Sequence, residues 1–173
     1  SQLTAWEMLD YIAILKGMND RQVRKKSIAK VLQQTGLLKV AECKVGTYSR
    51  GMSQRIGIAQ VLLGDPPVLL LDEPTAGLDP EERNKLKGIL AELGSNRVII
   101  WASSILTDTY CADRMLILNK GESYFFGTPY ELAAYKRIIN ELNFIHEEHL
   151  DYNDWTTLLE SGYQAILTSG AST

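Results

Sequence analysis

Hydrophobic residues in the first part of the chain are spaced so that each segment gathers them on one face of a helix. The pattern predicts three helices, over residues 4–17, 20–36 and 49–63. Thr4 and Glu7 have the spacing of a capping box, and Gly17 suits the end of the first helix. Asp20 and Ser49 belong to the residue types that cap helices well. The second helix is expected to bury Val23, Ile28, Val31 and Leu32.

From Pro66 onwards, short apolar runs alternate with helix-like segments. Residues 68–71 form a continuous apolar run, which is typical of a strand buried on both faces of a parallel sheet. A helix with proline in its first turn, a strand, a short helix, a hairpin and a further helix follow. Their expected ranges are 80–93, 97–102, 105–111, 114–126 and 128–135. The alternation predicts an α/β sheet with one antiparallel end.

Three parts are expected along the chain: a helical part over residues 1–65, an α/β core over 66–136, and an extension over 137–173. The extension has a helical pattern at first and an ambiguous one later, and from Thr168 it has the composition of a flexible end. His146 and His149 lie one helical turn apart in it. Because no Cys or third His is near, we interpret them as part of a solvated helix face rather than as a zinc pair.

Composition narrows the class of protein. Hydrophobic residues make up 45% of the chain and charged residues 23%, the mixture of a folded soluble domain. The longest apolar run, Pro66–Leu71, is too short to span a bilayer, and the first residues show no signal-peptide pattern. Cys43 and Cys111 match no metal or redox spacing and suggest a reducing cytoplasm. The net charge of −3 argues against nucleic acid as the main partner.

Two acids and then a third follow the apolar run in VLLLDEPTAGLDP, residues 68–80. A carboxylate at the C-terminal end of a buried parallel strand lies where open α/β sheets bind ligands. Asp72 is suited to hold Mg²⁺ through water, and Glu73 to orient or deprotonate an attacking water. Asp79 is placed to reach across an interface. The alternative, that the first two acids only cap a turn, is weakened by the apolar run before them and the Thr-Ala-Gly-Leu-Asp-Pro after them.

The stretch YSRGMSQR, residues 48–55, has the features of an anion site. Ser49 offers a hydroxyl, and Gly51 lets the backbone approach a phosphate. The start of the helix offers free N–H groups and the positive end of its dipole. The alternative is an ordinary capped helix. The position of the stretch one helix before the acidic strand favours the anion site.

At these residues the sequence resembles the nucleotide-binding domain of ATP-binding cassette (ABC) proteins. Residues 48–52 are similar to the family's Leu-Ser-Gly-Gly-Gln signature, and residues 68–73 to its magnesium-and-base strand. Residues 76–79 are similar to its dimer-contacting loop, and GTPYEL, residues 127–132, to the usual end of the core. The resemblance covers residues 3–136 and implies a partial P-loop NTPase fold. The Arg and Met variants of the signature are most similar to bacterial exporters of drugs, antibiotics and polysaccharides.

The resemblance implies an ATPase that uses Mg²⁺ and in which two nucleotide-binding domains enclose two ATP molecules. Glu73 would be the catalytic base and Asp72 the acid on the magnesium side. Nucleotide contacts, including those to the γ-phosphate bound by the opposite subunit, would come from Ser49, Arg50, Gly51, Met52, Gln54 and Asp79. The partners would be a second nucleotide-binding domain, in a homo- or heterodimer, and a transmembrane permease that residues 1–65 touch. The protein would be cytoplasmic and peripheral at the inner face of the cell membrane.

Two departures from the family pattern change the expectation. The chain contains no Gly-Lys-Ser or Gly-Lys-Thr phosphate loop, and Gln2 is too late for the family's magnesium-sensing glutamine. We therefore expect a fragment rather than a natural free-standing half-domain. It should bind ATP poorly alone, and its strand at Val68 should have an uncovered apolar edge. Ser104, counted as catalytic, stands where the family has a switch histidine. A hydroxyl is shorter than an imidazole and uncharged, so hydrolysis should be slow, unless water or a neighbouring group substitutes.

Two other functions stay open. A non-transport ABC ATPase would keep the fold and lack a permease; the helical part and the exporter-like signature argue against it. The segments RKKSIAKVLQQTGLL and YSRGMSQRIGIAQ superficially resemble a helix-turn-helix DNA reader, which should be basic and needs no acid pair. The basic run of Arg21, Arg24, Lys25 and Lys26 is interpreted as a solvated helix face.

Overall fold

The computed structural model describes residues 2–119, 121–132 and 164–169. The chain divides into two compact units. The first contains Ser1–Leu69 and Gly77–Leu93, and the second contains Leu70–Ala76 and Gly94–Thr173. The predicted part boundaries at residues 65 and 136 stay predictions.

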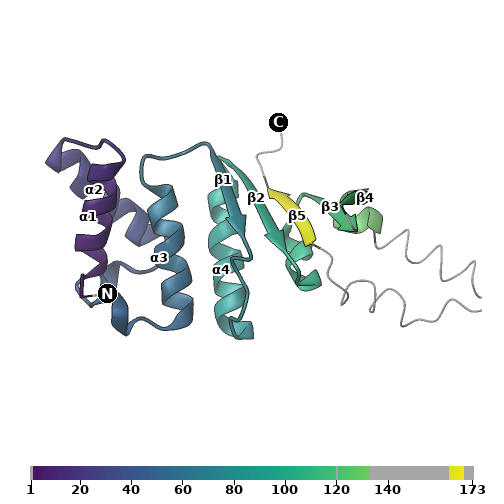
Figure 1. The fold of residues 1–173 in the computed structure, drawn as a ribbon, viewed down its shortest axis with the longest axis horizontal. Coiled ribbons are helices and arrows are strands. Elements are labelled where there is room, and N and C mark those ends of the chain that lie inside the picture. The colour runs from purple at the N-terminus through teal and green to yellow at the C-terminus, as the bar shows by residue number, and fades with distance from the viewer. Residues whose placement is uncertain (1, 120, 133–163, 170–173) are drawn as a thin grey trace, which may run out of the picture. The chain divides into compact units, whose positions relative to one another are not determined.

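The first unit is built from helices (Figure 1). They are α1 (Ala5–Leu15), α2 (Arg21–Gln34), α3 (Arg50–Leu62) and α4 (Pro80–Gly94), with short 3-10 helices at Leu38–Val40 and Val45–Thr47. Helices α1, α2 and α3 contact one another. Their core contains the buried side chains of Leu9, Ala13, Ile28, Leu32, Ala59 and Leu62. The three helices predicted in residues 4–63 and the helix predicted at 80–93 are confirmed.

The predicted helix caps are also confirmed. The Glu7 N–H donates to the Thr4 hydroxyl at 3.1 Å, and the Thr4 N–H donates to the Glu7 carboxylate at 2.9 Å. The two bonds that Thr4 donates to the Glu7 carboxylate, first the one from its N–H and then the one from its hydroxyl, lower the pKa of Glu7. Asp20 accepts hydrogen bonds from two N–H groups at the start of α2. Gly17 ends the first helical segment with a φ of 82°, which glycine adopts without strain.

One residue of the predicted buried face of α2 is misplaced. Ile28, Val31 and Leu32 are buried, but Val23 is 54% exposed. Val23 lies five positions before Ile28, and a helix advances about 100° per residue, so the two side chains point about 140° apart. The prediction that Val23 shares the buried face is therefore wrong.

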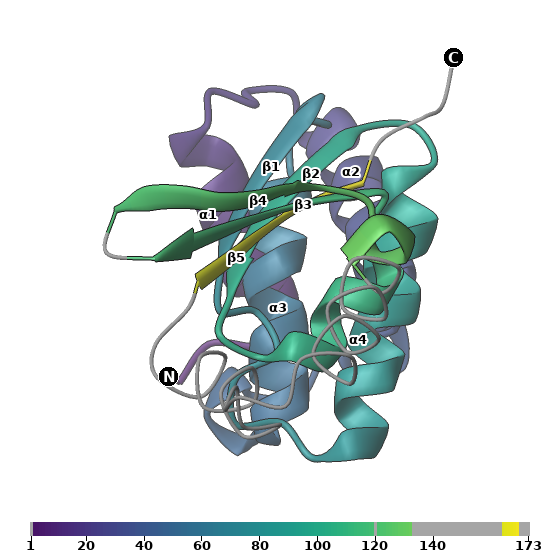
Figure 2. The ribbon, with the colours of Figure 1, turned by 90° about the vertical axis from the view of Figure 1, so that its right-hand side faces the viewer.

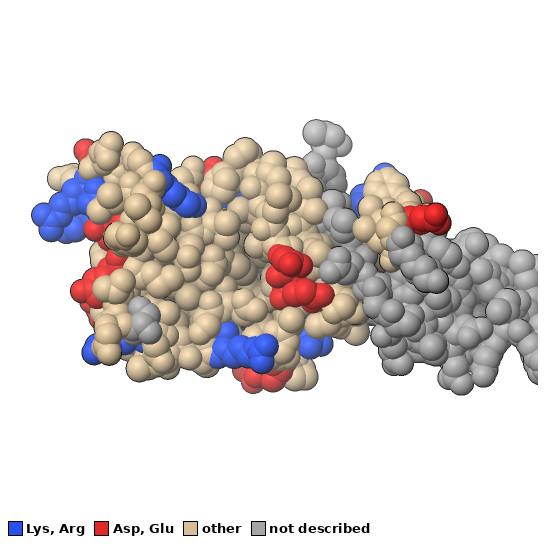
Figure 3. All heavy atoms as spheres, in the orientation of Figure 1, with Lys and Arg blue, Asp and Glu red and all other residues tan. Residues whose placement is uncertain are grey.

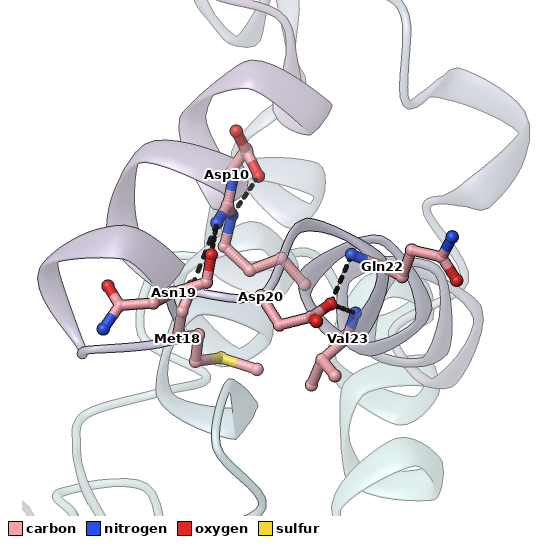
Figure 4. A network of polar contacts seen from close by, with 7 residues as sticks. Asp10, Met18, Asn19, Asp20, Gln22 and Val23 are labelled. Atoms are coloured by element: carbon pink, nitrogen blue, oxygen red, sulfur yellow. Dashed lines mark hydrogen bonds and ion pairs between the residues drawn. The ribbon is translucent and has the colours of Figure 1, made fainter.

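Arg24 corrects the interpretation of the basic run as a solvated face. Its guanidinium donates to Asp10 at 2.8 Å and to the backbone oxygens of Met18 and Asn19 at 3.1 and 2.9 Å (Figure 4). The Arg24 side chain is only 12% exposed, whereas the two lysines that follow it are exposed. Arg24 therefore ties α1 to the turn before α2, because it bonds a side chain of one and the backbone of the other. Other basic side chains gather at the surface of this end of the unit (Figure 3).

The second unit contains most of a five-stranded sheet in the order β1-β2-β5-β3-β4 (Figure 1). The strands are β1 (Val68–Asp72), β2 (Val98–Ser103), β3 (Arg114–Asn119), β4 (Glu122–Gly127) and β5 (Gln164–Ser169), and a 3-10 helix at Leu106–Cys111 follows β2. Glu73, which follows β1, donates its N–H to Ala102 near the end of β2 at 2.9 Å. The carboxyl ends of β1 and β2 are thus adjacent, so these strands are parallel. The predicted α/β class is confirmed.

The hairpin of β3 and β4 is antiparallel, as predicted (Figure 2). Strand β5, which no sequence pattern predicts, lies between β2 and β3 and pairs antiparallel with both. Thr168, expected in a flexible end, pairs with Ile100 and Arg114. The flexible-end prediction is therefore wrong for Thr168 and Ser169, because the backbones of two distant strands supply partners that local composition does not reveal. His146 and His149 lie outside the described residues.

Strand β1 is covered on one face only. Leu69 is 1% exposed and Leu70 is 71% exposed, because successive residues of a strand point to opposite faces. On β2, Val98 is 42% exposed while Ile99 is buried. Figure 3 shows largely uncharged side chains over these two strands. The predicted burial of residues 68–71 on both faces is therefore wrong. Strand β1 is an edge strand of the described sheet and exposes apolar side chains, so the expected uncovered apolar edge is present.

Candidate functional site

The expected site residues form two groups, one in each unit. The signature stretch at the start of α3 and Asp79 lie in the first unit, and Asp72, Glu73 and Ser104 lie in the second. Each group is assembled by local contacts of its own unit.

Ser49 caps α3, and the signature stretch forms the first turn of this helix. The Ser49 oxygen accepts a hydrogen bond from the Met52 N–H at 3.2 Å, and its O–H can still donate. Ser49 and Arg50 are exposed, and Met52 and Gln54 are half-buried. A hydroxyl and a cation exposed at the positive end of a helix are suited to contact a phosphate group.

Two glycines permit close contacts around this helix start. A Cβ atom on Gly51 would overlap the Glu82 carboxylate, and one on Gly77 would overlap the Arg50 guanidinium. Gly77 also has a φ of 67°, which other residues rarely adopt. The signature motif predicts that Gly51 admits a phosphate. The structure adds a second reason for glycine there, because Glu82 occupies the space beside it.

Arg55 and Glu82 join the start of α3 to the start of α4. Arg55 Nη2 lies 3.3 Å from Glu82 Oε2, and the Arg55 side chain is 5% exposed. Arg55 Nε also donates to the Gly51 oxygen at 3.3 Å. The Glu82 N–H donates to the Asp79 carboxylate at 2.9 Å, so Asp79 caps α4. Arg55 and Glu82, which no sequence motif singles out, therefore connect two of the expected site residues.

Asp72 and Glu73 lie at the carboxyl edge of the sheet, where β1 ends. Asp72 is exposed. Glu73 has a φ of 44°, uncommon for a residue other than glycine and a kind of strain that clusters at functional sites. Its Oε2 is buried and has no hydrogen-bond partner among the described residues. Buried carboxylate oxygens normally accept a hydrogen bond, so this oxygen is suited to accept one from a bound water or substrate.

Ser104 contacts Glu73 through its backbone. Its N–H donates to Glu73 Oε1 at 2.8 Å, while its side chain is exposed. The structure thus brings the expected base and the expected switch position together. The contact uses an amide that any residue except proline would provide at position 104.

Three buried polar residues form a hydrogen-bonded cluster next to this pair in the chain. The hydroxyls of Thr75 and Ser103 both donate to Asp108 Oδ2, the second at 2.9 Å. Thr75 and Asp108 are 0% exposed and Ser103 is 1% exposed. Sequence patterns single out none of the three as a site residue, because each is unremarkable in its own segment and their meeting depends on the fold.

No cluster of three or more His, Cys, Asp or Glu side chains in the described part of the chain could hold a metal ion. Magnesium typically uses one or two protein carboxylates and completes its shell with water and phosphate oxygens. The exposed carboxylate of Asp72, the residue before Glu73 in the chain, fits a magnesium ion that arrives with a nucleotide. These residues do not fit a site for the free ion.

Comparison with known proteins identifies the family. The ABC transporter family model matches residues 1–76. ABC transporter A family member 8 of Dictyostelium discoideum is 40% identical over 134 residues, which are 77% of this chain and 16% of that protein. Probable multidrug ABC transporter ATP-binding protein YbhF of Escherichia coli is 37% identical over 132 residues, 76% of this chain and 23% of that protein. The structure of cbiO1 from Clostridium perfringens, part of the ABC transporter complex cbiONQ, has a TM-score of 0.66 and 27% identity, covering 83% of this chain and 58% of that chain.

The chain therefore belongs to the ABC transporter ATP-binding family, whose members bind and hydrolyse ATP, usually with Mg²⁺. This membership favours the ABC interpretation over a helix-turn-helix DNA reader. The chain spans less than half the length of the curated relatives it matches. Within the described ranges, no helix is both long and apolar enough to cross a membrane.

Proposed function

We propose that this chain is part of the ATP-hydrolysing subunit of an ABC exporter, which couples ATP binding and hydrolysis to transport through a membrane permease. The observation that carries the proposal is the geometry of Glu73. Its backbone is held in a left-handed conformation, one carboxylate oxygen accepts from Ser104, and the other is buried with no hydrogen-bond partner among the described residues. Such a carboxylate is held in one orientation by Oε1, while Oε2 can accept a proton from an attacking water.

In this function Glu73 orients the attacking water and accepts its proton through Oε2. Asp72, exposed at the end of β1, would hold the magnesium ion through water. The ion, when bound, supplies positive charge that stabilises the charge developing on the phosphate oxygens. Ser104 contributes its N–H to the orientation of Glu73, and its hydroxyl is a weaker phosphate contact than an imidazole. We therefore expect slow hydrolysis.

The signature stretch serves the nucleotide bound by a second nucleotide-binding domain in a homo- or heterodimer. Ser49 and Arg50 are exposed at the start of α3, so both can reach a phosphate across an interface. Gly51 is itself buried and leaves room for the Glu82 carboxylate beside this turn. The proposed nucleotide contacts also include Met52, Gln54 and Asp79. Asp79 lies at the start of α4, where it caps the helix.

A permease is the proposed membrane partner of the helical unit. Tyr11, Ile14 and Leu15 of α1 are 61%, 47% and 68% exposed, and their spacing places them on adjacent parts of the helix surface. Grouped exposed apolar side chains mark interaction surfaces. The names of two similar proteins, one a multidrug transporter subunit and one part of a transporter complex, agree with this partner. The protein would then be cytoplasmic and peripheral at the inner face of the cell membrane.

The test is ATP turnover by the natural protein that carries this chain. Glu73→Gln is expected to lower kcat at least about a hundredfold while ATP binding is retained, because the amide cannot accept the proton. Glu42→Gln, which changes an exposed glutamate of the helical unit, is the matched control and should leave turnover unchanged. Turnover that is equal in the Glu73→Gln and unmodified proteins would refute the proposal. The 173 residues alone, which contain no phosphate loop, should show no Glu73-dependent turnover.

A further inference from the structure

The position of Glu73 depends on the backbone of residues 102–104. The Glu73 N–H donates to Ala102 O at 2.9 Å, and the Glu73 carboxylate accepts from the Ser104 N–H at 2.8 Å. Both the main chain and the side chain of the proposed base are thus bonded to the end of β2. A shift of this segment would carry the carboxylate with it.

Asp108 holds that segment in place from the 3-10 helix that follows β2. The Ser103 hydroxyl accepts from the Ile105 N–H at 3.1 Å and donates to Asp108 Oδ2 at 2.9 Å. The Asp108 N–H donates to the Ile105 oxygen at 3.0 Å. The turn that contains Ser104 is therefore closed by Asp108 through both its side chain and its backbone.

The same carboxylate oxygen also holds the segment that follows Glu73. The Thr75 hydroxyl donates to Asp108 Oδ2, and the Ala76 N–H donates to the Glu73 oxygen at 3.1 Å. Thr75 is two residues after Glu73, and Ser103 is one residue before Ser104. Asp108 therefore joins the two segments that contribute the Glu73–Ser104 contact. Because Thr75 and Asp108 are 0% exposed and Ser103 is 1% exposed, water cannot easily replace these bonds.

We propose that Asp108 is a positioning residue for ATP hydrolysis, which acts through the hydroxyls of Thr75 and Ser103 to keep Glu73 on the Ser104 amide. This inference rests on the proposed function, in which Glu73 is the base. A misplacement of about 1 Å at a catalytic group can lower a rate by about a hundredfold, so loss of one of these bonds should act on kcat. ATP affinity should change little, because none of the three side chains is exposed to a ligand.

The experiment compares Thr75→Val with Thr75→Ser in the natural protein that carries this chain. Valine matches threonine in shape but lacks the hydroxyl, whereas serine keeps it. Thr75→Val should lower kcat about tenfold or more, with KM and the affinity for ATP within about twofold. Thr75→Ser should keep kcat within about threefold of the unmodified protein. If Thr75→Val does not fold, Ser103→Ala removes the bond on the other side of Asp108 and should give the same loss of kcat.

Thr35→Val is the matched structural control. Thr35 is also 0% exposed, and its hydroxyl donates to the Val31 oxygen at 2.8 Å within the helical unit. Its loss should lower the midpoint of thermal unfolding without lowering kcat. Equal kcat losses in Thr75→Val and Thr35→Val, or an unchanged kcat in Thr75→Val, would overturn the positioning role and leave the proposed function intact. Absence of Glu73-dependent turnover in the unmodified protein would overturn both.

Discussion

The guanidinium of Arg55 and the carboxylate of Glu82 form an ion pair of 3.3 Å between two helix starts that carry different motifs. Arg55 also bonds the Gly51 oxygen in the signature turn, and the Glu82 backbone bonds Asp79 in the predicted dimer loop. Arg55 and Glu82 therefore link the signature turn at Gly51 to the dimer-contacting loop at Asp79. The signature and the dimer loop are separate motifs in the sequence but one cluster in the first unit.

Glu82→Gln is expected to lower the free energy of unfolding of the natural protein by about 2 kcal/mol, less than removing one partner of a fully buried ion pair costs, because the Glu82 side chain is 26% exposed. The reason is that the Arg55 side chain, only 5% exposed, would keep its charge without a counter-charge. Urea denaturation measures the change. Lys30→Met is the control, because the Lys30–Asp65 pair is 56% and 64% exposed and its loss should cost less than about 1 kcal/mol. Equal effects of the two substitutions would contradict this assignment.

Gly51→Ala is expected to lower the free energy of unfolding by about 1–3 kcal/mol, because the added methyl group overlaps the Glu82 carboxylate. Gly57→Ala, in the same helix but with no neighbouring atom near the added carbon, should raise it by about 0.5–1 kcal/mol through helix propensity. Denaturation of both variants provides the comparison. Combining Gly51→Ala with Glu82→Ala should cost less than the sum of the two single changes, since the overlap is then relieved. Strict additivity would show that the contact with Glu82 is not the cause.

Ser104→His is expected to raise ATP turnover by the natural protein about tenfold or more, because an imidazole adds a donor that can reach the transferred phosphate. Ser104→Ala should leave turnover within about twofold, since the contact with Glu73 uses the backbone N–H and survives the change. Steady-state ATP hydrolysis distinguishes the two. A rate unchanged by Ser104→His would mean that water or another group already performs this role.

The capping box of α1 should make the stability of the protein depend on pH. Hydrogen bonds from Thr4, first from its N–H and then from its hydroxyl, lower the pKa of Glu7 below its ordinary value of 4.5. A lowered folded pKa means that the stabilisation is present above the unfolded pKa and is lost as pH falls through the folded pKa. Glu7→Gln should therefore destabilise the protein at neutral pH and much less at a pH below the folded pKa of Glu7. Thr4→Ala should destabilise it at both pH values, because it removes the cap on the Glu7 N–H but keeps the stronger bond from the residue 4 N–H to the carboxylate. Unfolding at the two pH values measures this, and Glu7→Gln should remove the part that depends on pH.

Local sequence patterns were sufficient to predict structure where neighbouring residues along the chain supply the hydrogen bonds. The caps at Thr4, Asp20 and Ser49 form as expected, because each side chain bonds an N–H two or three residues away. The strand at residues 68–71 and the hairpin after Arg114 were also predictable from apolar runs and a turn sequence. Of the site, the sequence placed Asp72 and Glu73 at the end of a strand. It did not indicate that Glu73 has a positive φ or that Ser104 meets it through an amide.

The class of the protein and the location of its motifs can be read from the amino-acid sequence, because capping boxes, apolar periodicity and the acidic strand are all encoded within about a dozen residues. Which distant groups meet depends on the folded arrangement of the chain. In the fold, β5 lies between β2 and β3, Arg55 pairs with Glu82, and the hydroxyls of Thr75 and Ser103 both bond Asp108. The physical reason is that buried polar groups must find partners, and folding chooses those partners by position in space rather than by spacing along the chain.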